Sequence, residues 1–155
     1  MRFQKIFIVF FVSLISICPL CAGAQVLPPP EIQKAVTMED ARQLINEYAA
    51  RFMKLALDPY MGLFSEKAVE NRTLPYADIR EAYRLTIAGS RSIVYTLDIY
   101  SIQTYTESAF VTGRYKIIQA FKKGGTAVFK GDIQWDLIQE NGSLKIRGVD
   151  YGRDP

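Results

Sequence analysis

The spacing of apolar residues changes along the chain from a helical period to a strand period. From Thr37 to about Pro59 apolar residues recur every three or four positions, which predicts an amphipathic helix. These positions are Ala41, Leu44, Ile45, Tyr48, Phe52 and Leu55. Thr37 and Asp40 have the spacing of a capping box, with Asp in place of the usual Glu or Gln. From Ser92 onward the period becomes two, which is typical of strands.

Shorter elements are expected between these two regions. Met61–Phe64 is predicted to form one more helical turn, and Ala68–Asn71 a short strand. Pro75 suits the first turn of a second helix, which runs to Ala88 and is stopped by Gly89.

The alternating region predicts four strands, at about Ile93–Tyr105, Ser108–Phe121, Ala127–Glu140 and Leu144–Val149. Asn141-Gly142 is a strong signal for a tight hairpin between the last two. Two helices followed by a four-strand antiparallel meander predict an α+β domain with the helices packed on one face of the sheet.

The predicted hairpins set the neighbours of the single tryptophan. A two-residue turn at Asn-Gly places Leu137 opposite Ile146 and Trp135 opposite Gly148. A five-residue connection before the third strand places Trp135 opposite Gly113. An indole flanked by glycine on both sides predicts a strongly bent sheet that wraps the first helix, because strand glycines mark bends and close approaches.

The register of the first strand has two solutions. Pairing Thr104 with Ala109 points one set of side chains inward, and a shift of one residue points the other set inward. The first set is Thr96, Asp98, Tyr100 and Ile102, and the second, more apolar set is Ile93, Tyr95, Leu97 and Ile99. A bulge would satisfy both, with different halves of the strand facing inward.

The N-terminus has the pattern of a secretory signal peptide. Arg2 and Lys5 precede an apolar run over Ile6–Ile17, and Ala22-Gly23-Ala24 supplies small residues at the −3 and −1 positions. The run is too short for a membrane-spanning helix, which needs about 20 residues. We therefore expect cleavage near Ala24 and a periplasmic or secreted protein.

This pattern divides the chain into a signal peptide (1–24), a Pro-rich linker (25–36) and one domain (37–155). The signal peptide carries two basic and no acidic residues. Cleavage therefore changes the chain's 19 basic and 16 acidic residues to 17 and 16. A nearly neutral domain gives no reason to expect nucleic acid as a partner.

Both cysteines, Cys18 and Cys21, are lost with the signal peptide, so no disulfide is expected.

The absence of histidine removes several kinds of chemistry. A Ser-His-Asp triad and a histidine-ligated metal site are impossible without it. Acidic residues such as Asp132 and Asp136 do not have the spacing of a ligand cluster. Neither a metal nor a cofactor is therefore predicted.

Three segments resemble the nuclear transport factor 2-like superfamily, also called the SnoaL-like or cystatin-like fold. They are Leu63–Ser65, Asp78–Tyr83 and Trp135–Ile146, and the resemblance covers about residues 38–151. It implies a cone in which two to three N-terminal helices pack on a strongly curved, four- to six-stranded antiparallel sheet, with a pocket at the open end. Members include ketosteroid isomerases, polyketide cyclases, dehydratases and non-catalytic domains. Some exported members belong to the bacterial cell envelope, and some resemble accessory domains beside peptidoglycan-trimming enzymes.

Two functions follow from this resemblance. The first, which we favour, is an exported, non-catalytic binding or accessory domain of the bacterial cell envelope that holds a small apolar ligand or a partner protein. Its pocket residues would be Tyr48, Phe52, Tyr100, Tyr115, Ile133 and Trp135. The alternative is a small isomerase or cyclase in which Asp98 or Asp150 acts with Tyr115 as a hydroxyl donor.

The outer face of the sheet is a candidate surface for pairing with a second copy. Ile118, Val128 and Ile138 are apolar positions among charged residues there. We therefore expect a homodimer through this face.

Overall fold

The computed structural model describes residues 35–154, and this part of the chain forms three helices and six strands. In chain order they are α1 (Met38–Met53), α2 (Leu57–Met61), β1 (Phe64–Glu70), β2 (Leu74–Pro75), α3 (Tyr76–Gly89), β3 (Ser90–Thr104), β4 (Ser108–Phe121), β5 (Thr126–Glu140) and β6 (Ser143–Tyr151). The predicted signal peptide, its cleavage site and most of the predicted linker lie outside the described residues.

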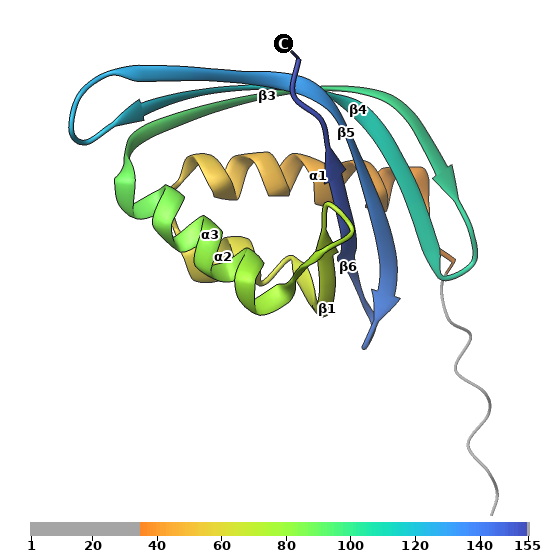
Figure 1. Cartoon of the computed structure of the whole chain (residues 1–155). Coiled ribbons are helices and arrows are strands. Elements are labelled where there is room, and N and C mark those ends of the chain that lie inside the picture. Colours follow the sequence, from red (N-terminus) through yellow and green to blue (C-terminus); the bar gives the residue numbers. More distant parts are fainter. Residues whose placement is uncertain (1–34, 155) are drawn as a thin grey trace, which may run out of the picture. The chain divides into compact units, whose positions relative to one another are not determined.

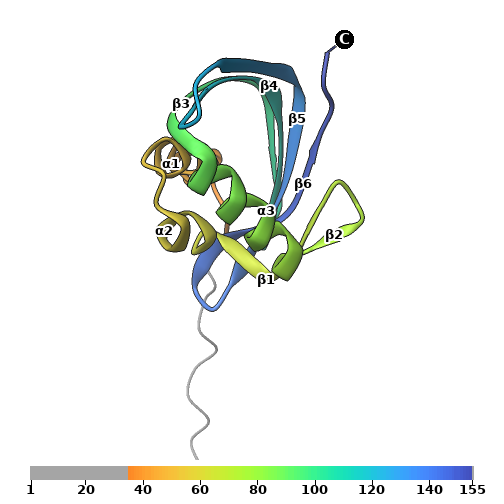
Figure 2. The same ribbon diagram turned by 60° about the vertical axis from the view of Figure 1, so that its left-hand side comes forward.

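The six strands form one curved sheet in the order β2-β1-β6-β5-β4-β3. Neighbouring strands are antiparallel except β1 and β6, which run parallel. The long strands β3, β4 and β5 bend along their length, and the three helices lie on the concave side (Figures 1 and 2). The domain therefore has the predicted α+β architecture, with helices on one face of a curved, unclosed sheet.

Helix α1 begins as its sequence predicts. The Thr37 hydroxyl accepts a hydrogen bond from the Asp40 amide at 3.1 Å, and the Asp40 carboxylate accepts one from the Thr37 amide at 3.1 Å. This reciprocal pair confirms the capping box. The helix ends at Met53, earlier than predicted, because Leu55 adopts a positive φ of 54° that interrupts the helical backbone.

The connection between α1 and α3 differs from the prediction. The additional helical turn lies at Leu57–Met61 rather than at Met61–Phe64. The predicted strand at Ala68–Asn71 begins earlier, at Phe64, and ends at Glu70. The reason is pairing with β6: the Ile146 amide donates to the Leu63 carbonyl at 2.9 Å, which draws this segment into the sheet.

The turn between β5 and β6 confirms part of the predicted register. Asn141 and Gly142 both have positive φ, at 51° and 76°, and Leu137 lies opposite Ile146. A bulge at Asp136 and Leu137 then shifts the pairing, so Trp135 lies opposite Val149 and not opposite Gly148.

The β4–β5 connection is tighter than expected. The Phe121 amide donates to the Gly125 carbonyl at 3.1 Å and Ala120 lies opposite Thr126, so the pairing is displaced by two residues from the predicted one. Trp135 consequently lies opposite Val111, and Gly113 lies opposite Ile133. The prediction that glycines flank Trp135 on both sides is therefore wrong, although the sheet is curved.

A bulge in β3 resolves its register. Thr104 pairs with Ala109, and the pairing shifts between Ile99 and Ser101. Before the bulge Ile93 and Tyr95 are buried, and after it Ile102 faces inward and is half-buried. Residues of both predicted sets therefore face inward: Ile93 and Tyr95 of the second set before the bulge, and Ile102 of the first set after it. Gly113 lies beside this bulge, where a Cβ atom would stand 2.5 Å from the Asp98 carbonyl oxygen.

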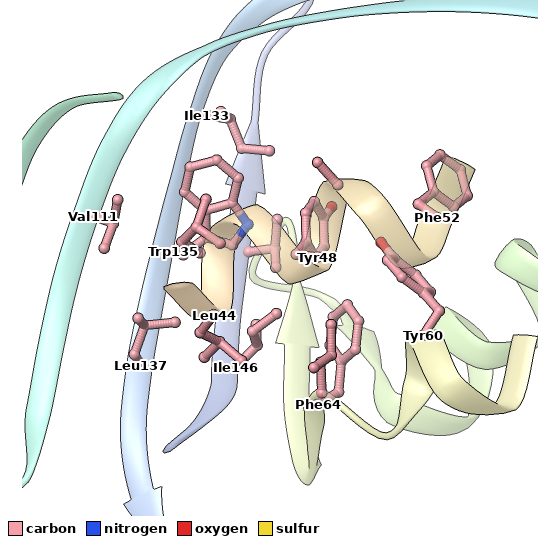
Figure 3. Packing of buried hydrophobic residues seen from close by; sticks show 14 of the residues in the cluster. Leu44, Tyr48, Phe52, Tyr60, Phe64, Val111, Ile133, Trp135, Leu137 and Ile146 are labelled. Atoms are coloured by element: carbon pink, nitrogen blue, oxygen red, sulfur yellow. The ribbon is translucent and has the colours of Figure 1, made fainter. Parts of the chain in front are cut away.

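Trp135 occupies the centre of the core. Its side chain is fully buried and meets Tyr48 of α1 edge to face, with ring centroids 5.7 Å apart. Figure 3 shows the two rings together, with Leu137 and Ile146 beside them. The inner face of α1 therefore packs directly against β5 and β6, as the apolar periodicity of α1 predicts.

The convex face carries a small apolar strip. Val94, Ile118 and Val128 lie opposite one another across β3, β4 and β5, and Val94 and Val128 are more than half exposed. Ile138 lies apart from them, opposite Ser108. Pairing of two copies through this face stays a prediction.

Candidate functional site

A cavity of about 220 Å³ lies between α1, α3 and the concave face of the sheet. Aromatic rings form most of its wall, namely Tyr48, Phe52, Tyr83, Tyr95, Tyr115, Phe129 and Tyr151. Aliphatic side chains fill the gaps between them, and Thr86, Gln119 and Arg153 add polar groups. Such a wall suits a small, largely apolar molecule.

The sheet register brings the wall together. Tyr95, Ile117 and Phe129 lie opposite one another on β3, β4 and β5, and all three side chains point to the concave side. Tyr48 and Phe52 are four residues apart on α1 and therefore share its inner face. Alternation in the strands and the helical period of α1 thus build one aromatic chamber.

Tyrosine hydroxyls gather on the helix side of the chamber. The hydroxyl oxygens of Tyr48 and Tyr83 are 3.4 Å apart, and the Tyr60 ring lies 4.8 Å from the Tyr83 ring. The Tyr60 hydroxyl is buried and has no hydrogen-bond partner among the described residues. Burial raises the pKa of Tyr48 and Tyr60 well above its ordinary value, so both stay protonated.

Glu70 is the one acidic residue that is buried in the described part of the chain. It ends β1 and is only 4% exposed. The Tyr151 hydroxyl donates to its Oε1 atom at 2.7 Å, while Oε2 is buried without a partner in the described part of the chain. Burial raises the pKa of the Glu70 carboxyl, and the hydrogen bond from Tyr151 opposes that rise. Since Tyr83 and Tyr151 line the cavity, Glu70 lies one layer behind its wall.

The raised pKa of Glu70 predicts a pH dependence of stability. Its folded-state pKa lies above the ordinary value of 4.5, so its contribution to stability is fully present below that value and is lost as the pH rises through the folded pKa. The free energy of unfolding of the wild type should therefore fall over this range relative to that of Glu70→Gln. Urea unfolding of both proteins from about pH 4 to about pH 8 measures the difference. Parallel pH profiles would contradict the assignment.

The structure places four of the six predicted pocket residues in the cavity wall. Tyr48, Phe52, Tyr115 and Ile133 line it. Trp135 packs behind Tyr48 in the core and does not line the cavity. Tyr100 is 58% exposed and lies at the bulge of β3, which turns it away from the concave face.

Neither predicted catalytic aspartate lies in the cavity. Asp98 is exposed on the convex face, opposite Arg114, because the residues on either side of it point inward. Asp150 is also outside, since its neighbours Val149 and Tyr151 face the core. Its carboxylate accepts from Arg72 at 3.3 Å and from Gln134 at 3.1 Å. The predicted pairing of either aspartate with Tyr115 is therefore wrong.

Sequence reasoning missed Glu70, although the pattern held a signal for it. The predicted strand at Ala68–Asn71 places Ala68 and Glu70 on one face, and the same alternation buries both. An acid on the apolar face of a strand indicates a buried carboxyl. Tyr83, Tyr95 and Tyr151 were also missed as pocket residues. Tyr83 lies on α3, Tyr95 belongs to one of the two registers left open for β3, and Tyr151 lies beyond the predicted end of the last strand.

Within residues 35–154 no group of histidine, cysteine, aspartate or glutamate side chains is arranged to hold a metal ion. In the same part of the chain, no helix has the length and apolar character needed to cross a membrane.

Comparison by sequence finds no matching family model and no matching curated protein. Solved structures do match. A nuclear transport factor 2-like superfamily protein of Salmonella enterica serovar Typhimurium superposes with a TM-score of 0.66 at 19% identity, over 76% of this chain and 90% of its own.

Two further structures carry names that point to enzymes. A protein of Novosphingobium aromaticivorans named as a candidate aromatic ring hydroxylase has a TM-score of 0.68 at 17% identity, with 77% and 93% of the two chains covered. A ketosteroid isomerase-like protein of Erwinia carotovora atroseptica has a TM-score of 0.63 at 15% identity, with 77% and 100% covered. Identities this low establish the architecture alone. The described domain has the nuclear transport factor 2-like fold.

Proposed function

We propose that this domain is a non-catalytic binding module that holds a small, largely apolar and aromatic molecule in the chamber between α1, α3 and the sheet. The aromatic wall of the 220 Å³ cavity carries this proposal. Planar rings can stack on or meet the edges of tyrosine and phenylalanine side chains there, and burial of apolar surface supplies the affinity.

One observation favours an enzyme as the second candidate. The Glu70 carboxyl and the Tyr151 hydroxyl form a buried acid–tyrosine pair, a combination that can move or hold a proton. However, Glu70 does not itself line the cavity, and its carboxyl is separated from a bound molecule by the ring of Tyr151. Binding without chemistry therefore fits the observed geometry better.

Export and an accessory role in the bacterial cell envelope are part of the same proposal. The basic, apolar and small-residue pattern of residues 1–24 supports them. The mass of the protein recovered from the periplasm or medium tests export, because the cleaved chain should begin at Gln25. Recovery of the intact chain in the cytoplasm would contradict it.

Filling the chamber should weaken binding. Thr86 lines the cavity from α3, so Thr86→Trp introduces an indole beside the space that a ligand needs. We expect at least a tenfold loss of affinity for 2-naphthalenemethanol, a neutral two-ring probe, in isothermal titration calorimetry.

The matched control is Thr96→Trp, which adds the same indole on the exposed convex face of β3. This variant should bind the probe as the wild type does. Equal affinity of the Thr86→Trp variant and the wild type would place the ligand elsewhere, and a wild type that does not bind would overturn the proposed function.

A further inference from the structure

We propose that the ligand carries a carboxylate or a similar anionic group, which Arg153 binds at the edge of the aromatic chamber. This inference rests on the proposed function and specifies its ligand class. It follows from three features of the residues after β6: where they run, what holds them, and which charge is left without a partner.

The chain continues along β5 after β6 ends. We call Gly152–Asp154 the C-terminal strap. Its Gly152 amide donates to the Asp132 carbonyl at 3.0 Å, and its Asp154 amide donates to the Lys130 carbonyl at 2.9 Å. The Tyr115 hydroxyl, from the cavity wall, donates to the Gly152 carbonyl at 2.9 Å. The strap is therefore fixed to the sheet on both sides of Arg153.

A glycine makes room for the strap. A Cβ atom at Gly131 would stand 2.2 Å from the Gly152 carbonyl oxygen and 3.2 Å from the Arg153 Cα atom. The strap thus crosses directly over Gly131, whose position faces the core side of β5. Because Gly131 has no side chain, the backbone of Arg153 can pack close to β5 beside the cavity wall.

Arg153 is the one charged residue among the described residues that line the cavity. Its guanidinium carbon lies 4.8 Å from the centroid of the Phe129 ring, which also lines the cavity. No carboxylate in the described part of the chain lies within ion-pair distance of Arg153. Within residues 35–154 the guanidinium therefore has an aromatic support but no counter-ion.

The nearest acid in sequence is engaged elsewhere. The Asp154 carboxylate pairs with Arg114, and Lys130 Nζ lies 3.8 Å from it. Arg114 also pairs with Asp132 at 3.1 Å, so the two cations and two carboxylates of this cluster balance one another without Arg153. A ligand anion would supply the missing charge at Arg153.

The Arg153 guanidinium and the apolar chamber would bind different parts of one ligand. A guanidinium presents paired N–H donors that match the two oxygens of a carboxylate, and stacking on an aromatic ring holds its plane in place. The apolar chamber takes the rest of the molecule. An aromatic carboxylate meets both requirements, whereas an aromatic amine would bring its positive charge toward that of Arg153.

Three probes with one ring system test this assignment: 2-naphthoate, 2-naphthalenemethanol and 2-naphthylmethylammonium. In titration calorimetry at neutral pH, the wild type should bind the acid at least tenfold more tightly than the alcohol, and the ammonium most weakly. Arg153→Gln should remove this preference, so that 2-naphthoate binds no more tightly than the alcohol. Arg42→Gln, which removes the same charge from the exposed face of α1, is the control and should keep the preference.

The outcomes separate this inference from the proposed function. If the wild type binds the acid and the alcohol equally, the anionic ligand class is overturned while binding in the chamber stands. If the preference survives Arg153→Gln, the assignment to Arg153 is overturned. If none of the three probes binds, the proposed function fails.

Discussion

Replacement of Trp135 by alanine should lower the free energy of unfolding by about 3 to 5 kcal/mol. The indole is fully buried, packs edge to face on Tyr48 and lies between Val111 and Val149. Its removal leaves a cavity between α1 and the sheet that neither element can close. Domains of this size are commonly stable by about 5 to 15 kcal/mol, so the loss is a large share of the total. Urea unfolding followed by far-ultraviolet circular dichroism measures it, since the variant has no tryptophan left to report by fluorescence.

Two matched variants separate packing from other effects. Trp135→Phe keeps most of the ring and removes an indole Nε1 atom that has no hydrogen-bond partner among the described residues, so its loss should stay below about 1.5 kcal/mol. Tyr100→Ala removes an aromatic side chain that is 58% exposed and should change stability by about 0.5 kcal/mol or less. A Trp135→Ala variant no less stable than Tyr100→Ala would contradict the central place of Trp135.

The pattern of the sequence predicts the elements of this fold well and their pairing less well. The capping box at Thr37, the second helix and the Asn141-Gly142 turn depend on neighbouring residues, and all three are confirmed. The partners of Trp135 depend on a bulge and on the length of a connection. Each moves the register by a residue or two, and neither leaves a clear mark in the apolar pattern.

For the candidate site too, residues on regular elements were predicted better than residues whose direction depends on strand pairing. Tyr48 and Phe52 belong to a periodic helix, and both side chains line the cavity. Asp98 and Asp150 were chosen from a register that the bulges change, and both point outward. Arg153 follows the last strand, where no alternation remains to indicate its direction. Its place depends on the contact between Gly131 and the strap, which joins residues about 20 positions apart.

Substitution of Gly131 by alanine should detach the C-terminal strap. The added methyl group would meet backbone atoms of Gly152 and Arg153, which cannot turn aside as a flexible side chain does. We expect loss of the hydrogen bonds from Gly152 to Asp132 and from Asp154 to Lys130, with a decrease in stability of about 1 to 3 kcal/mol. Thermal unfolding measures the decrease, and faster hydrogen exchange at the Gly152 amide reports the opening of the strap.

The same substitution links the strap to ligand choice. Because hydrogen bonds of Gly152 and Asp154 fix the backbone of Arg153 beside the chamber, Gly131→Ala should lose the preference for 2-naphthoate over 2-naphthalenemethanol while the alcohol still binds. Gly89→Ala is the control: it ends α3, and a Cβ atom there meets nothing within 4 Å, so stability and preference should both be retained. A Gly131→Ala variant that keeps the stability and the preference of the wild type would show that Arg153 reaches the chamber without the strap.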